Sequence, residues 1–188
     1  MPAQTGSTLP AFAAGMGILT TRGVVAVDDL VAGDMVLTRD SGYAPLRFAA
    51  KLEGLHPMVA VGPDTLGPGA PQHDLIVAAG LGLWELHNEA NRRPVEALRL
   101  CAMPGAHRAS PRRMVALLCD RAVGLFSGGA WVECPAPTAR LVAQMLPLLA
   151  EPDREALVAA FADQGLPAAA AQIAQATTAP HGYGARLH

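Results

Sequence analysis

The chain has 188 residues, of which 51% are hydrophobic and only 16% are charged, and its formal net charge is −2. This composition is typical of a globular protein and excludes a largely disordered one. The weakly acidic balance also argues against nucleic-acid binding, because phosphate backbones select strongly basic surfaces.

The cysteines and the first ten residues indicate the cellular compartment of the protein. Cys101, Cys119 and Cys134 show no Cys-x-x-Cys spacing and leave one thiol over, which predicts neither a disulfide framework nor a zinc site. The histidines are likewise never spaced as metal ligands are. Residues 1–10 lack the basic and apolar regions of a signal peptide, and no apolar run approaches the ~20 residues of a membrane span. We expect a cytoplasmic protein with no membrane segment, cofactor or metal.

Short strands and tight turns are predicted for the first third of the chain. From residue 18 to residue 61, short apolar runs alternate with Gly, Asp and Pro, a pattern typical of consecutive strands. Gly33 precedes one such run and suits a turn that needs a positive φ. Residues 62–73 are rich in proline and glycine and predict an irregular loop.

Further strands follow this loop. Residues 75–78 predict a buried strand, and residues 83–87 predict its hairpin partner. Residues 112–125 predict two strands interrupted at residues 120–121, and residues 127–133 predict a turn and a last strand.

Arginines cluster weakly at residues 92–93, at Arg108 and at residues 112–113. Prolines lie beside these clusters, and no aromatic side chains are interleaved with them. We therefore interpret them as solvated loops rather than as contacts to nucleic acid.

The period of the sequence changes after Pro135. Apolar residues from 141 to 149 recur at helical spacing, and residues 151–161 continue the pattern after an acidic first turn. The alanine-rich residues 168–174 favour a further helix. We expect a flexible N-terminus over residues 1–8, a β domain over 9–137, a helical appendage over 138–175 and a mobile tail over 176–188.

The predicted helices are apolar on more than one side, which leaves two interpretations open. The side chains either pack onto the β domain or form a docking surface for a protein partner or a second copy. The residues concerned are Leu146, Leu148, Leu149, Leu157, Val158 and Phe161.

Three stretches carry a family resemblance. They are Ala11-Phe12-Ala13-Ala14-Gly15-Met16, then Val27-Asp28-Asp29-Leu30-Val31-Ala32-Gly33-Asp34-Met35-Val36-Leu37-Thr38, and Leu66-Gly67-Pro68-Gly69-Ala70-Pro71-Gln72-His73-Asp74-Leu75-Ile76-Val77. A looser match follows at Cys119-Asp120-Arg121, Gly128-Gly129 and Glu133. Over roughly residues 9–137 the sequence resembles bacterial Hint (hedgehog/intein) domains. The resemblance implies a mainly β, horseshoe-shaped fold, here with a small α-helical C-terminal appendage, and relatives that cleave themselves through a thioester.

The chain departs from the family where the chemistry of self-cleavage is performed. The family's nucleophilic cysteine aligns with Ala11, and the histidine that protonates the departing amide nitrogen aligns with Leu81. The late Asp-x-His pair aligns with Asp120 and Ala122. A methyl group cannot attack a carbonyl, and neither Leu81 nor Ala122 can carry a titrating proton.

Two functions from different classes remain open at this point. The first is a Hint-like domain that has lost self-cleavage and serves as a non-catalytic binding or assembly module. The alternative is residual self-cleavage with a relocated nucleophile, for which Cys119 beside Asp120 is the best candidate. His73 is a weaker catalytic candidate, because adjacent strand residues point to opposite faces and Asp74 would not orient it.

Overall fold

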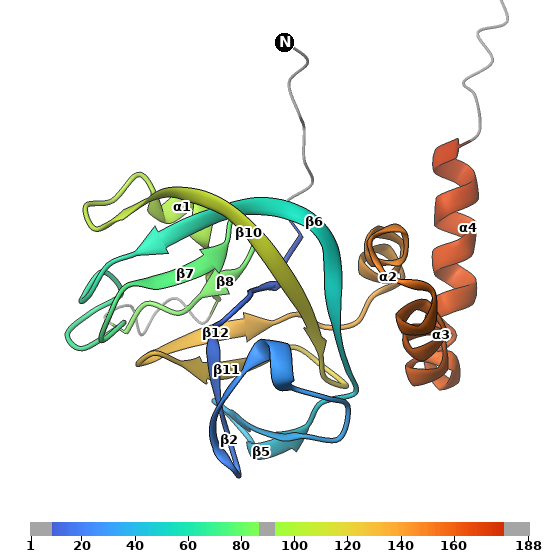
Figure 1. The fold of residues 1–188 in the computed structure, drawn as a ribbon, viewed down its shortest axis with the longest axis horizontal. Coiled ribbons are helices and arrows are strands. Elements are labelled where there is room, and N and C mark those ends of the chain that lie inside the picture. The colour runs from blue at the N-terminus through green and yellow to red at the C-terminus, as the bar shows by residue number, and fades with distance from the viewer. Residues whose placement is uncertain (1–8, 87–92, 179–188) are drawn as a thin grey trace, which may run out of the picture.

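The computed structural model describes residues 9–86 and 93–178, with side chains described up to residue 175. Two β-sheets form most of the molecule, and a group of helices lies at one side of them (Figure 1). The expected flexible N-terminus, most of the expected mobile tail and His87 lie outside the described residues. The prediction of a mainly β fold with a small C-terminal helical appendage is confirmed.

The first sheet is built on two long strands that run antiparallel. Its order is β1 (Phe12–Ala13), β10 (Ala106–Leu118), β6 (Phe48–Val61) and β7 (Leu75–Ala78). Buried and exposed residues alternate at the start of β6, whereas the end of β10 is buried on both faces. These two strands therefore pass from a solvent-facing ribbon into the core.

The length of these strands corrects two predictions. The sequence predicted only short strands before residue 61, and it predicted loops around Arg108 and Arg112, yet β6 and β10 run continuously through these regions. The pairing shifts register around Arg112, and Gly54 adopts a positive φ of 87° inside β6. Such irregularities let a strand continue past residues that usually end one.

The second sheet has the order β3, β2, β4, β11, β12, β8, β9, with β5 paired to β4. Its strands are β2 (Gly17–Thr20), β3 (Gly23–Ala26), β4 (Met35–Thr38), β5 (Gly42–Pro45), β8 (Gly82–Leu83), β9 (Val95–Glu96), β11 (Val123–Ser127) and β12 (Ala130–Cys134). The predicted interruption at residues 120–121 and the glycine turn at 128–129 are both confirmed, and both glycines have a positive φ.

The predicted hairpin between residues 75–78 and 83–87 is wrong. β7 pairs with β6, whereas β8 pairs with β12 and β9 in the other sheet. Both residues of β8 are buried. A segment buried on both faces lacks the alternation that would specify its partner strand.

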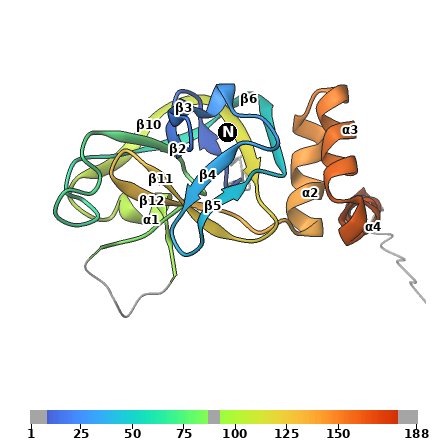
Figure 2. The ribbon, with the colours of Figure 1, turned by 90° about the horizontal axis from the view of Figure 1, so that it is seen from below.

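The C-terminal helices are α2 (Ala139–Met145), η2 (Leu146–Leu148), α3 (Glu151–Ala160), η3 (Ala162–Gln164) and α4 (Leu166–Thr178). The Thr138 hydroxyl accepts a hydrogen bond of 3.2 Å from the Leu141 N–H and caps α2. Helix α2 packs against α4, and α3 packs against β6 (Figure 2). The short elements α1 (Ala97–Leu100) and η1 (Val27–Asp29) were not predicted.

One apolar cluster joins both sheets and the helices. Leu149, Leu157 and Phe161 are buried in it, Leu146 and Leu148 are half-buried, and Val158 remains 41% exposed. Intramolecular packing therefore accounts for most of the apolar helix surface. Within the described residues, no helix combines the length and apolarity needed to cross a bilayer.

Candidate functional site

Ala11 immediately precedes β1, where the resemblance places the nucleophile. Strand β1 pairs with β10, with Phe12 opposite Val115. The side chain of Ala11 is 0% exposed and belongs to the apolar core. The position therefore holds a packed methyl group, and the backbone around it is fixed by the long strand β10.

Leu81 lies in the short turn between β7 and β8. Its N–H donates a 3.0 Å hydrogen bond to the carbonyl of Ala78, and its own carbonyl accepts a 2.8 Å bond from the N–H of Ala97. The side chain is 0% exposed and is also part of the core. Strand β1 packs against β7, which places the segments of Ala11 and Leu81 in one region of the fold.

Asp120 follows β10 and has a different setting. Its Oδ1 atom accepts a 2.8 Å hydrogen bond from the Arg47 guanidinium, and its side chain is 57% exposed. Ala122, two residues later, is exposed. Asp120 thus forms an ion pair at the surface, outside the apolar core that holds Ala11 and Leu81.

Arg47 extends this ion pair to the helices. Its second terminal nitrogen donates to the carbonyl of Ala160 and, at 3.2 Å, to the carboxylate of Asp163. The guanidinium also lies 5.5 Å from the ring centroid of Phe161. We call Arg47 and its contacts to Asp120, Ala160, Phe161 and Asp163 the arginine clasp, because they join the β domain to the C-terminal helices.

Cys119 is 2% exposed. It lines a cavity of about 260 Å³ together with Ala44, Pro45, Asp120, Arg121 and Val123. Leu9, on the amino side of Ala11, lines a separate narrow cavity of about 20 Å³ with His56, Pro57, Ala78, Ala79, Gly80 and Met114.

His56 was not singled out from the sequence. Its Nε2 atom lies 3.0 Å from the carbonyl oxygen of Glu53, and it lines the same narrow cavity as Gly80, the residue before Leu81. No local sequence signal could have found this neighbour of the Leu81 turn, because the proximity depends on the register between two strands.

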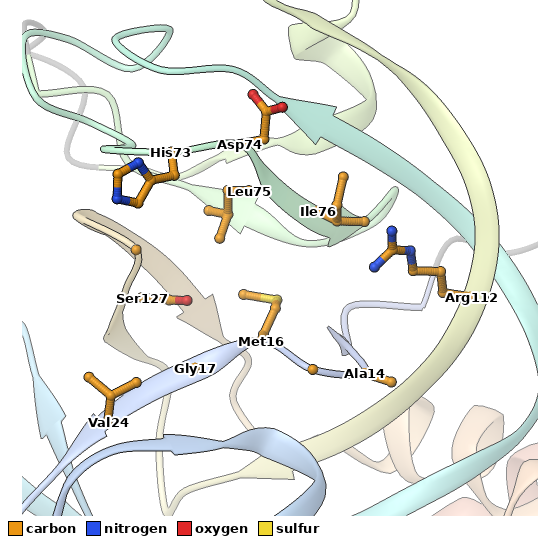
Figure 3. A pocket seen from close by; sticks show the side chains of 12 residues that line it. Ala14, Met16, Gly17, Val24, His73, Asp74, Leu75, Ile76, Arg112 and Ser127 are labelled. Carbon is orange, nitrogen blue, oxygen red and sulfur yellow. The ribbon is translucent and has the colours of Figure 1, made fainter.

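A cleft of about 450 Å³ opens between β2, the start of β7 and β10 (Figure 3). His73, Asp74 and Ser127 all line it, a set of residue types that resembles a nucleophile triad. None of the described hydrogen bonds connects these three side chains to one another, however, and Ser127 is buried.

Among the residues that the structure describes, no group of three or more His, Cys, Asp or Glu side chains could hold a metal ion.

Comparison with known proteins places these observations in a family. The model of the Hint domain matches residues 10–139. The crystal structure of the MchDnaB-1 intein is 13% identical and has a TM-score of 0.48, covering 65% of this chain and 98% of its own. The solution structure of a bacterial intein-like domain from Clostridium thermocellum is 14% identical with a TM-score of 0.45, covering 66% of this chain and 97% of its own. Curated protein sequences give no significant match. Because the family model spans more than half of the residues, this chain belongs to the Hint domain family.

Proposed function

We propose that this chain is a Hint domain that has lost self-cleavage and serves as a non-catalytic binding or assembly module. One observation carries the proposal. Ala11 and Leu81, which align with the family's nucleophile and general acid, are both completely buried side chains of the apolar core. Neither has an atom that can attack a carbonyl or transfer a proton.

The position of Asp120 supports the same conclusion. In the described structure its carboxylate binds Arg47, and the arginine clasp in turn contacts the C-terminal helices. A charge-assisted pair of this kind contributes to packing between parts of a fold. The loop that aligns with the family's late catalytic segment therefore has a structural task here.

The alternative, self-cleavage by Cys119, requires a free and exposed thiol. Cys119 is 2% exposed, and its thiol interacts with that of Cys134. An attack on the bond before Ala11 would first have to break this packing, which favours the non-catalytic proposal.

Gel electrophoresis of the purified chain and of a Cys119→Ser variant separates the two functions. The non-catalytic proposal predicts a single band for both proteins after prolonged incubation. Discrete fragments that form in the native chain and disappear in Cys119→Ser would establish the alternative.

Self-association through the C-terminal helices is the form of assembly that we propose. Val158 on α3 remains 41% exposed, and Leu146 and Leu148 on η2 are only half-buried. Burying such residues at a symmetric contact between two copies would remove apolar surface from water.

Sedimentation velocity over a range of protein concentrations tests this assembly. We expect a dimer that dissociates on dilution, and a monomer for Val158→Asp, because a buried unpaired charge opposes association. Val24→Asp on β3, at another exposed valine, is the matched control and should still dimerise. A native chain that stays monomeric at every concentration would rule out self-association.

A further inference from the structure

Two of the three cysteines meet between the sheets. Cys119 follows β10 in the first sheet, and Cys134 ends β12 in the second. The thiol of Cys134 donates to the carbonyl of Leu117, two residues before Cys119, at 3.3 Å, and it also interacts with the Cys119 thiol. Val123, which pairs with Cys134, lines one cavity with Cys119. The two thiols are therefore neighbours, although the strands that carry them belong to different sheets.

The surroundings make the two thiols unequal. Cys119 lines the cavity of about 260 Å³ near Ala44 and Pro45, whereas Cys134 is 0% exposed and is not among the residues that line this cavity. A small molecule that enters this cavity meets Cys119 first. Asp120 and Arg121 at the cavity's edge give it a polar rim.

Hydrogen bonding shifts the pKa values of the two thiols in opposite directions. The hydrogen bond from Cys134 lowers the pKa of Cys119, outweighing burial and the nearby Asp120 carboxylate, both of which raise it. The pKa of Cys134 is raised well above its ordinary value, chiefly by the same hydrogen bond and also by burial. The front thiol is thus the better nucleophile, because the thiolate is the reactive form.

We propose that Cys119 and Cys134 form an oxidation-sensitive thiol pair, in which a hydroperoxide oxidises Cys119 and Cys134 then closes a disulfide. This reaction requires no self-cleavage and goes beyond the proposed binding function. The thiol pair gives a chemical role to the cavity beside Asp120. The proposed binding function assigns no role to this cavity.

The reaction balances in two steps. The Cys119 thiolate attacks one oxygen of the hydroperoxide, so that the O–O bond breaks, the sulfur becomes a sulfenic acid and an alkoxide or hydroxide leaves and is protonated by solvent. The Cys134 sulfur then attacks the Cys119 sulfur. The S–O bond breaks, an S–S bond forms, and the thiol proton leaves with the hydroxyl group as water.

Hydrogen peroxide and the reduced full-length chain provide the test. After exposure, the chain is denatured, its free thiols are alkylated with N-ethylmaleimide, and the product is analysed by intact mass and peptide mapping. We expect only one of the three thiols to be alkylated and a single disulfide that joins Cys119 to Cys134.

Variants assign the order of the two steps. In Cys134→Ser the reaction should stop at a sulfenic acid on Cys119, which dimedone traps. In Cys119→Ser both remaining thiols should stay alkylatable at the same peroxide dose. Cys101→Ser is the matched control and should form the same disulfide as the native chain.

Three results would overturn the proposal. They are full alkylation of the native chain after peroxide, a disulfide that includes Cys101, and equally fast formation of the Cys119 to Cys134 disulfide in urea, where the folded pair is absent. The peptide map of the native chain decides the question even if a serine variant fails to fold.

Discussion

At the scale of single residues, the positions that the resemblance aligns with the family's nucleophile and general acid are part of the core. Ala11 and Leu81 are 0% exposed, and burial of such side chains removes apolar surface from water. The sequence alone predicted that both positions lack catalytic atoms. It could not predict that they are fully buried, because burial depends on the packing of β1 against β7 and β10.

The thiol pair and the arginine clasp could not be predicted from the sequence. Cys119 and Cys134 have no diagnostic spacing, and they meet only because the fold brings the end of β10 beside β12. Arg47 and Asp163 are likewise distant in the chain and are joined only by docking of the helices. Long-range contacts of this kind leave no local pattern in an isolated sequence.

The carboxyl group of Glu133 should make the free energy of unfolding depend on pH. Burial raises the pKa of its carboxyl group, so the folded state binds this proton more tightly than the unfolded state does. The free energy of unfolding should therefore fall as pH rises from the unfolded pKa through the folded pKa of Glu133.

The substitution Glu133→Gln tests this dependence by urea denaturation at several pH values. The variant should lose the part of the pH dependence that comes from Glu133. At neutral pH it should be more stable than the native chain, by up to about 1 kcal/mol because the side chain is only partly buried. Glu155→Gln at an exposed position on α3 is the charge-matched control. An unchanged pH profile in Glu133→Gln would show that burial of this carboxylate carries no cost.

At the scale of elements, the helices are held to the β domain by packing and by the arginine clasp. Leu157 and Phe161 supply buried apolar contacts, and Arg47 adds charge-assisted hydrogen bonds at the edge. The helical spacing after Pro135 predicted these helices correctly. It did not predict how they dock, because docking depends on side chains from β6 and from the segment after β10.

The substitution Arg47→Ala should weaken this docking. It removes the ion pairs to Asp120 and Asp163 and the contact with the Phe161 ring, with an expected loss of about 1–3 kcal/mol in the free energy of unfolding. Limited proteolysis should then cut first between β12 and α2.

Arg99→Ala removes an arginine that is 80% exposed and 3.8 Å from Glu96, and it should change stability by less than about 0.5 kcal/mol. If Arg47→Ala were as stable and as protease-resistant as Arg99→Ala, apolar packing alone would hold the helices.

The lengths of the strands could be predicted only in part from local sequence patterns. The sequence predicted the strand at residues 75–78, the turn at 128–129 and the loop at 62–73. It missed the continuity of β6 through Gly54 and Pro57, because these residues usually end a strand. Pairing with β10 supplies the stabilisation that the local sequence lacks.

At the scale of the whole molecule, one apolar cluster spans both sheets and the helices. The mainly β class and the family followed from motifs near Ala11, Gly33 and Asp74, which fix turns and strand starts. The partner of β8 in the other sheet did not follow, since a doubly buried segment fits more than one neighbour. The fold is thus that of the Hint domain family, and its core includes Ala11 and Leu81, on which the proposed loss of self-cleavage rests.

Intact mass spectrometry tests this central claim most directly. The freshly purified chain is measured, incubated with dithiothreitol or hydroxylamine, which attack thioesters, and measured again. Loss of self-cleavage predicts an unchanged mass of 19.4 kDa in both measurements. A loss of mass that corresponds to residues 1–10, or cleavage at any other single bond, would contradict the account and identify a nucleophile that the buried Ala11 does not supply.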